Sequence, residues 1–184
     1  MITFDTVGTC VNYALNNKPP KELEDYCGLY YSPYYLLMHA LCSFLAPCNV
    51  VELGCEKGRG VLSMALNKNV MVYGVESQPN IEILDMLCNT TNFILFKHTS
   101  NLLPELIRCK PISLIHFDTE HSYAQVKSEF SVWKDVLVPG AILLYDDIHA
   151  RNDDVIKWIV EQKFDNLILE DRLHPSCGYA VVQI

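Results

Sequence analysis

The stretch that decides the fold is VVELGCEKGRG at residues 50–60, where an apolar run passes through a glycine-rich loop into a segment with helical periodicity. Glycines in a strand-to-helix turn permit a tight backbone and the close approach of a ligand. One such loop is weak evidence, because any strand-to-helix turn can use glycine. The next apolar run ends in Glu76, 22 residues after Gly54. An acid there can accept hydrogen bonds from both ribose hydroxyls of a nucleoside cofactor, so the two features together are a much stronger signal.

Two nucleoside cofactors fit this pair of features, a dinucleotide and S-adenosylmethionine. The CEKGRG that follows Gly54 breaks the G-x-G-x-x-G spacing of a dinucleotide site. Glu52 and Glu56 would also place negative charge beside a pyrophosphate. A sulfonium and an ammonium group tolerate those carboxylates. The residues therefore favour S-adenosylmethionine and disfavour a nicotinamide oxidoreductase.

Outward from this loop, short apolar runs alternate with amphipathic stretches. The predicted strands are 49–53, 70–76, 92–96, 112–118, 140–147, 166–170 and 178–184. The predicted helices are 59–68, 79–89, 101–109, 122–137 and 152–163. Such alternation predicts an α/β, Rossmann-like fold, with a mostly parallel seven-stranded sheet and helices on both faces. The last two strands have no helix between them, which predicts a C-terminal antiparallel hairpin.

The first 48 residues have a different character. They hold six of the ten tyrosines and several prolines, and a helix is expected at 33–45. We expect residues 1–48 to form an N-terminal helical cap over the sheet edge, and residues 49–184 to form the Rossmann-like core. The whole chain, 1–184, is then predicted to be one domain.

Composition limits the partners that can be expected. The net charge is −8 and the 14 basic residues are scattered, which argues against nucleic acid. No apolar run approaches the roughly 18–20 residues of a membrane span, so we expect a cytoplasmic protein with a small-molecule substrate. The eight cysteines include no C-x-x-C pair and lie mostly among apolar neighbours, which predicts reduced structural thiols.

A second unusual stretch is FDTEHSY at 117–123, in which an apolar strand ends in Asp118, Glu120 and His121. Ser122 and Gln125 are spaced as a capping box, so a helix should begin directly after His121. These three side chains then lie at the carboxyl edge of the sheet, where open α/β sheets bind their ligands.

The strand predicted at 140–147 also ends in acids, Asp146 and Asp147. If it neighbours the strand ending in Asp118, three carboxylates converge, and a divalent cation would relieve their repulsion. Oxygen ligands of this kind suit magnesium. The alternative is ordinary structure, in which Asp118 merely ends a strand and Asp147 or Asn152 caps the following helix.

The chain resembles the class I S-adenosylmethionine-dependent methyltransferases. VVELGCEKGRG is similar to their glycine loop, VYGVES to the strand with the ribose-binding acid, and LFKHTSNLLPEL to a segment flanking adenine. The segment from IHFDTEHSY to LLYDDIH is similar to the branch that contains sugar O-methyltransferases. The resemblance implies a cation, commonly magnesium, held by Asp118, Asp146 and Asp147. It also implies cofactor contacts from Glu52, Gly54, Gly58, Glu76, Ser77, Ser100, Asn101 and Asp118.

The expected activity is a metal-assisted O-methylation of a small hydroxylated molecule. The catalytic candidates are Asp118, Glu120 and His121. Either Glu120 or His121 could take the hydroxyl proton, and His121 is slightly favoured because an unperturbed histidine titrates nearest neutral pH. The alternative is a methyltransferase-fold module that binds a cofactor or partner without transfer. Acceptor specificity is expected to depend on residues 1–48 or on a second subunit of a homo-oligomer.

Overall fold

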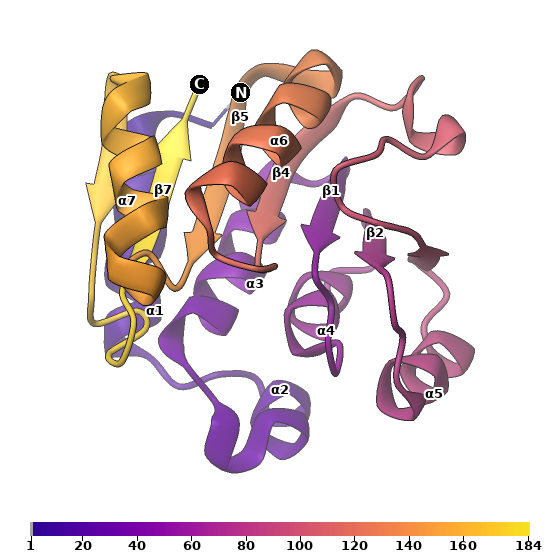
Figure 1. The fold of residues 1–184 in the computed structure, drawn as a ribbon. Coiled ribbons are helices and arrows are strands. Elements are labelled where there is room, and N and C mark those ends of the chain that lie inside the picture. Colours follow the sequence, from indigo (N-terminus) through magenta and orange to yellow (C-terminus); the bar gives the residue numbers. More distant parts are fainter. Residues whose placement is uncertain (1) are drawn as a thin grey trace.

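In the computed structural model, which describes residues 2–184 apart from the side chains at positions 86 and 87, seven strands form one sheet (Figure 1). Their order across the sheet is β3-β2-β1-β4-β5-β7-β6. The strands are β1 Cys48–Leu53, β2 Val70–Glu76, β3 Phe93–Lys97, β4 Ile112–Phe117, β5 Leu137–Asp146, β6 Asn166–Leu169 and β7 Tyr179–Gln183. The first five pair in parallel, and β7 runs antiparallel to both β5 and β6. The predicted Rossmann-like sheet and its C-terminal antiparallel pair are confirmed.

Two apolar clusters, one on each face of the sheet, form the core. Successive strand residues point to opposite faces, so Val50 joins one cluster and Val51 the other. The helices whose side chains join the first cluster are α1 Phe4–Asn16, α2 Lys21–Cys27, α3 Pro33–Leu45, α4 Arg59–Ala65 and α5 Ile81–Asn89. The second face is covered by α6 Tyr123–Trp133 and α7 Ala150–Gln162 (Figure 1). Burial on both faces explains why the strands read as continuous apolar runs.

The N-terminal helices cover a face of the sheet, which corrects the expectation that they cap its edge. Leu37 and Leu41 on α3 are fully buried against the cluster that contains Leu114 and Ile142 of the central strands. The helix expected at 33–45 is α3, with the same bounds. A short 3₁₀ helix, η1 Gly28–Tyr30, joins α2 to the segment before α3.

Several predicted boundaries differ from the structure, and the helix expected at 122–137, for example, ends at Trp133. The helix expected at 101–109 is reduced to the 3₁₀ helix η2 Glu105–Ile107, because Pro104 lacks an N–H and disfavours helical backbone before it. Strand β5 begins three residues before position 140, after the 3₁₀ helix η3 Lys134–Val136, and carries a register irregularity against β4. Near the start of α7, residues 151–153 have left-handed backbone.

Two further expectations concern the thiols and the membrane. The structure describes all eight cysteines, and each is a free thiol. Burial raises the pKa of the Cys10 and Cys27 thiols to about 11, so they behave as small apolar side chains. Among residues 2–184, no helix is long and apolar enough to cross a membrane.

Candidate active site

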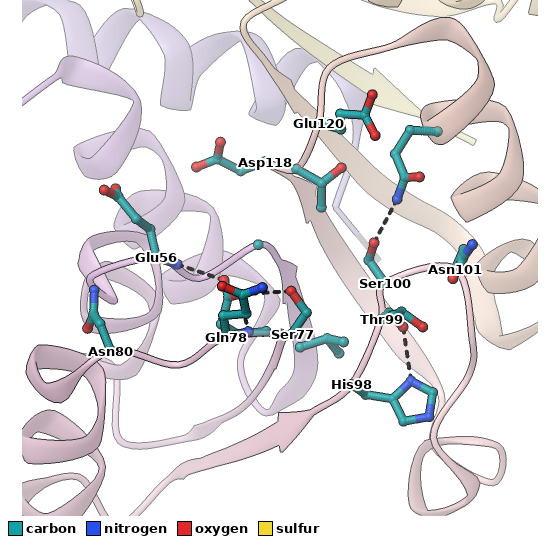
Figure 2. A pocket seen from close by; sticks show the side chains of 15 residues that line it. Glu56, Ser77, Gln78, Asn80, His98, Thr99, Ser100, Asn101, Asp118 and Glu120 are labelled. Carbon is teal, nitrogen blue, oxygen red and sulfur yellow. Dashed lines mark hydrogen bonds between the residues drawn. The ribbon is translucent and has the colours of Figure 1, made fainter.

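A cavity of about 600 Å³ opens at the carboxyl edge of the sheet, among the residues that directly follow β1, β2, β3 and β4 (Figure 2). We call it the cofactor cavity. Its walls include seven of the predicted site residues, namely Gly54, Glu76, Ser77, Ser100, Asn101, Asp118 and Glu120. Residues that the sequence analysis does not assign to the site also line it, namely Glu56, Val75, Gln78, Asn80, His98, Thr99, Thr119 and Gln125. Glu52, Gly58, His121, Asp146 and Asp147 lie outside this lining.

The glycine loop brings two strand ends together at the floor of the cavity. Gly54 has a φ of +82°, and its N–H donates to the carbonyl of Val75 over 2.9 Å. A Cβ on Gly54 would overlap the carbonyl oxygen of Asp118. Gly58, with a φ of +80°, is the N-cap residue of α4. The loop therefore needs glycine at residue 54 because the backbone of the β4 end passes against it.

Glu76 ends β2 with its carboxylate held in place by backbone donors. The N–H of Gln78 donates to it over 2.9 Å and that of Glu56 over 3.2 Å (Figure 2). Ser77 adds a hydroxyl contact at 3.4 Å. A carboxylate oriented this way at the cavity wall is suited to accept the hydroxyls of a ribose.

The opposite wall rests on a buried acid, Glu129, that the sequence analysis does not assign to the site. Glu129 is fully buried on α6 and accepts hydrogen bonds from Thr119 and Gln125, each over 2.8 Å. Gln125 also donates to Ser100 over 2.9 Å. Burial raises the pKa of Glu129, and these donors oppose the shift only in part. The sequence contains one signal for this contact, because residues four positions apart on a helix, here Gln125 and Glu129, lie on the same face.

Only one of the two hydrogen bonds of the predicted capping box forms. The Ser122 hydroxyl accepts from the N–H of Gln125 over 3.3 Å, as expected of an N-cap. The side chain of Gln125 turns to Ser100 and Glu129 instead of back to Ser122, because those partners offer buried acceptors.

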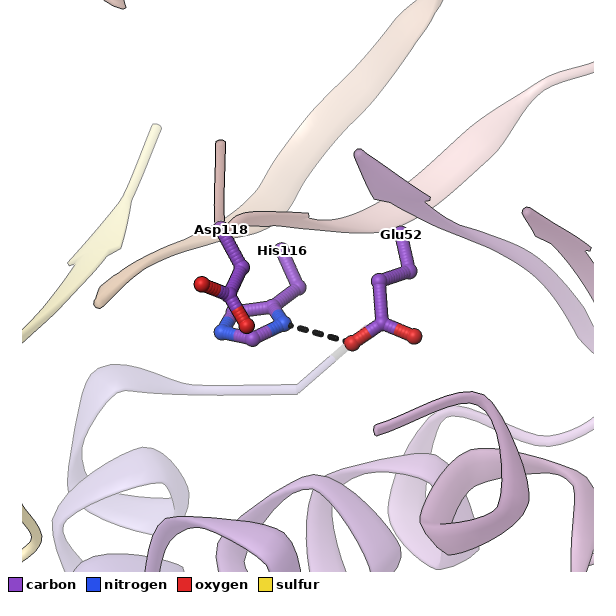
Figure 3. A group of neighbouring side chains, drawn as sticks. All are labelled: Glu52, His116 and Asp118. Carbon is purple, nitrogen blue, oxygen red and sulfur yellow. Dashed lines mark hydrogen bonds and ion pairs between the residues drawn. The ribbon is translucent and has the colours of Figure 1, made fainter. Parts of the chain in front are cut away.

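Glu52 points away from the cofactor cavity. Its carboxylate is buried and lies 3.0 Å from Nδ1 of His116, which is itself fully buried on β4 (Figure 3). Burial raises the pKa of Glu52, and that of His116 is raised because Glu52 and Asp118 outweigh the effect of its burial. Gly60 on α4 has no room for a Cβ because Glu52 fills that space. Glu52 thus packs against Gly60 and helps to hold the glycine loop and the start of α4 in place.

Asp118, Asp146 and Asp147, which we call the acidic cluster, lie at or directly after the ends of the neighbouring strands β4 and β5. The side chains that lie close enough to share a metal ion form two groups, in which Asp118 joins Glu52 and His116, and Asp146 and Asp147 join His174. His121 lies between two of them, with Nε2 3.3 Å from Asp118 and Nδ1 3.6 Å from Asp147. Burial lowers the pKa of His121, but the neighbouring carboxylates more than reverse this and the net shift is upward. Glu120 is exposed and lies 3.1 Å from the guanidinium of Arg151. The structure therefore brings His121, and not Glu120, to the acidic cluster.

His174 is the residue of this site that sequence reasoning missed. Its Nδ1 lies 2.6 Å from Asp146 and 3.2 Å from Asp147. These carboxylates raise the pKa of His174 to about 10, and His174 holds that of Asp147 below its usual range. Burial and the nearby Asp118 raise the pKa of Asp146. The strand directions indicate this contact. Because β7 runs antiparallel to both β5 and β6, the loop after β6, which carries His174, lies at the same edge of the sheet as the end of β5.

The arrangement joins a polar cofactor cavity to a cluster of carboxylates and imidazoles through a single residue. Asp118 lines the cavity and also lies beside His121. Groups of this kind can hold a cation and accept a proton from a hydroxyl placed between them.

Comparison with known proteins is consistent with this geometry. The sequence profile of a family described as "Methyltransferase domain" matches residues 51–148. No curated protein matches the sequence.

Solved structures share the fold at low sequence identity. A putative caffeoyl-CoA O-methyltransferase from Staphylococcus aureus is 14% identical, with a TM-score of 0.68 over 98% of this chain and 99% of that one. The TDP-rhamnose 3′-O-methyltransferase CalS11 of calicheamicin biosynthesis is 17% identical, with a TM-score of 0.60 over 97% and 93%. Aeropyrum pernix fibrillarin, solved with bound S-adenosyl-L-methionine, is 18% identical, with a TM-score of 0.58 over 81% and 74%.

Proposed function

The chain belongs to the methyltransferase domain family, and from that premise we propose that it transfers a methyl group from S-adenosylmethionine to an oxygen of a small hydroxylated molecule, with a divalent cation at the acidic cluster. The observation that carries this proposal is the position of Asp118. It lines the cofactor cavity and lies 3.3 Å from His121, so a methyl donor in the cavity and a hydroxyl at the acidic cluster would meet there.

The cofactor cavity supplies suitable contacts for each part of S-adenosylmethionine. Glu76, already oriented by two backbone N–H groups, would accept the ribose hydroxyls. Ser100 and Asn101, on the wall formed after β3, would flank the adenine. Gly54 leaves its backbone open for the amino acid part. This lining contains the acids Glu56, Glu76, Asp118 and Glu120 and no lysine or arginine, which suits a ligand with a sulfonium charge.

The donor set of the acidic cluster fits a divalent cation. Asp146 is almost fully buried, and a buried carboxylate needs a positive partner; His174 supplies one at 2.6 Å, and a divalent cation would supply another. A cation bound by Asp118, Asp146 and Asp147 would lower the pKa of a substrate hydroxyl and orient it. His121, which lies beside Asp118 and Asp147, would accept the proton of that hydroxyl. Glu120 and Arg151 would form a polar rim.

A small acceptor is supported by the charge and by the names of two structural neighbours, a putative caffeoyl-CoA O-methyltransferase and a TDP-rhamnose 3′-O-methyltransferase. We propose that residues 1–184 act as one methyltransferase domain in the cytoplasm. Residues 1–48 or a second subunit would complete the acceptor site.

Calorimetric titration with S-adenosylmethionine and S-adenosylhomocysteine tests the proposal. Glu76→Gln should weaken binding by about 10–100-fold, because a hydrogen bond to a charged group contributes about 1.5–3 kcal/mol. Glu105→Gln is the matched control, since Glu105 pairs with Arg108 on the surface outside the cavity. Absence of binding by either nucleoside would refute the proposal. Binding without turnover of any hydroxylated acceptor would instead support a binding module.

A further inference from the structure

We propose that Gln125 selects the base of the nucleoside cofactor. Its side-chain oxygen accepts a hydrogen bond from the 6-amino group of adenine, and the buried Glu129 fixes the amide in the orientation that this contact requires. The inference rests on the proposed function, since it names the residue that recognises the base in the same cofactor cavity. Glu129 is a positioning residue, because it acts on the nucleoside through Gln125.

The hydrogen bonds of Gln125 allow one orientation of its amide. Its Nε2 lies 2.8 Å from Oε1 of Glu129 and 2.9 Å from the hydroxyl of Ser100. Oε1 of Glu129 also accepts the hydroxyl of Thr119 over 2.8 Å. A carboxylate oxygen accepts hydrogen bonds, so the amide atom that faces it is the nitrogen. Both N–H groups of Gln125 are therefore used inside the wall of the cavity.

The oxygen of the same amide is left for a ligand. Gln125 lines the cofactor cavity, beside Ser100 and Thr119. No donor among the described residues reaches the side-chain oxygen of Gln125, and this oxygen is not one of the buried polar atoms in that part of the chain that lack a partner. It is an accessible acceptor at the cavity wall, and its direction is set by the two bonds of the nitrogen.

The wall holds this orientation before any ligand binds. Glu129 is fully buried on α6, so core packing fixes its position. Trp133, four residues further along the same helix, donates from its indole N–H to the carbonyl of Ser100 over 2.7 Å. Ser100 follows β3 and Thr119 follows β4, so three elements meet at one carboxylate. An acceptor that is already oriented needs little further ordering when the base binds.

The chemistry of the base decides what such an acceptor recognises. Ser100, which we propose to flank the adenine, is bonded directly to Gln125. The 6-amino group is the N–H donor of adenine, whereas a 6-oxo purine presents an oxygen acceptor at the same position. An oxygen of Gln125 facing a 6-oxo group would leave two acceptors opposed and unpaired, which is costly. The arrangement therefore favours adenine over 6-oxo purines.

Calorimetric titration of the full-length protein with S-adenosylhomocysteine and with its 6-oxo analogue, S-inosylhomocysteine, tests this inference. The two ligands share the ribose and the homocysteine part, so the ratio of their dissociation constants reports on the base alone. The wild type should bind S-adenosylhomocysteine at least about 10-fold more tightly, the scale set by a buried acceptor left without a partner. Gln125→Met keeps the length of the side chain without the amide, and should lower this preference by at least about 5-fold.

Substitutions at Glu129 separate positioning from packing. Glu129→Met removes the acceptor, so the amide of Gln125 is free to turn over and the preference should fall as it does in Gln125→Met. Glu129→Gln keeps an acceptor oxygen for Gln125 and should retain the wild-type preference. Gln162→Met is the matched control, since Gln162 is exposed at the end of α7 and lies outside the cavity lining. Its ratio should equal that of the wild type.

Equal binding of the two ligands by the wild type, or full preference for adenine in Gln125→Met, would overturn the inference. In both cases the binding of S-adenosylhomocysteine leaves the proposed function standing. Binding of neither ligand by the wild type would overturn the proposed function, and this inference with it. If Glu129→Met fails to fold, as a change in the core can, Gln125→Met at its partly exposed position decides alone.

Discussion

At Gly54 the backbone, and not only a ligand, requires glycine. We predict that Gly54→Ala destabilises the protein by about 2 kcal/mol or more, because a Cβ there would overlap the carbonyl of Asp118 in a left-handed residue. Urea denaturation measures the change. Gly8→Ala is the control, since Gly8 lies inside α1 with open space around it and alanine should stabilise that helix by up to about 1 kcal/mol. A Gly54→Ala protein as stable as the wild type would contradict the backbone contact.

Glu129 links pH to stability. Its folded pKa is raised, so the folded state loses stability as the pH rises from the unfolded value through the folded value. Glutamine keeps an acceptor for Thr119 and Gln125 and has no charge to bury. Glu129→Gln should therefore gain stability relative to the wild type between pH 5 and pH 8.

Denaturation curves of both proteins at the two pH values measure this difference. The exposed Glu22→Gln should show the same stability difference from the wild type at both. A constant difference for Glu129→Gln would mean that Glu129 titrates as it does in the unfolded chain.

At the scale of elements, the loop between β6 and β7, residues 170–178, depends on one apolar anchor for its position. Leu173 is fully buried, while the neighbouring Arg172 and Glu170 make a surface ion pair of little energetic value. We predict that Leu173→Ala costs about 2–4 kcal/mol of stability, as expected for a buried leucine.

Thermal unfolding checks this prediction. Leu29→Ala, at a leucine with 102% relative exposure, should change stability by no more than about 0.5 kcal/mol. A Leu173→Ala protein as stable as the wild type would show that the loop keeps its position without this anchor.

Elements also show where local sequence rules succeed and where they stop. Strand β2 and helix α3 have the bounds that periodicity predicts, because each is a complete run with clear ends. The helix expected at 101–109 is nearly lost, because one proline removes its hydrogen bonding. The sequence pattern predicts no bounds for helices α1 and α2, which lie in the segment 1–48 with its several prolines and tyrosines.

At the scale of the whole molecule, the cofactor cavity exists only when four strand ends are assembled. A ligand that binds there should stabilise the folded state alone, by about 2.7 kcal/mol at 100 times its dissociation constant. For a domain of this size S-adenosylhomocysteine should then raise Tm by about 5–10 °C. Differential scanning fluorimetry measures the shift, which should shrink in Glu76→Gln at the same concentration. An unchanged Tm at saturating nucleoside would contradict binding in this cavity.

The sequence by itself determined the alternation of strands and helices, the glycine loop and its spacing to Glu76. These are local patterns, set by side-chain period and backbone freedom over a few residues. Only the tertiary structure decided that Glu52 turns to His116, that Glu120 pairs with Arg151, and that His174 meets Asp146. The last contact joins residues 28 positions apart. It forms because β7 inserts between β5 and β6 and brings the loop after β6, residues 170–178, to the carboxyl edge, an outcome of strand order that no local pattern encodes.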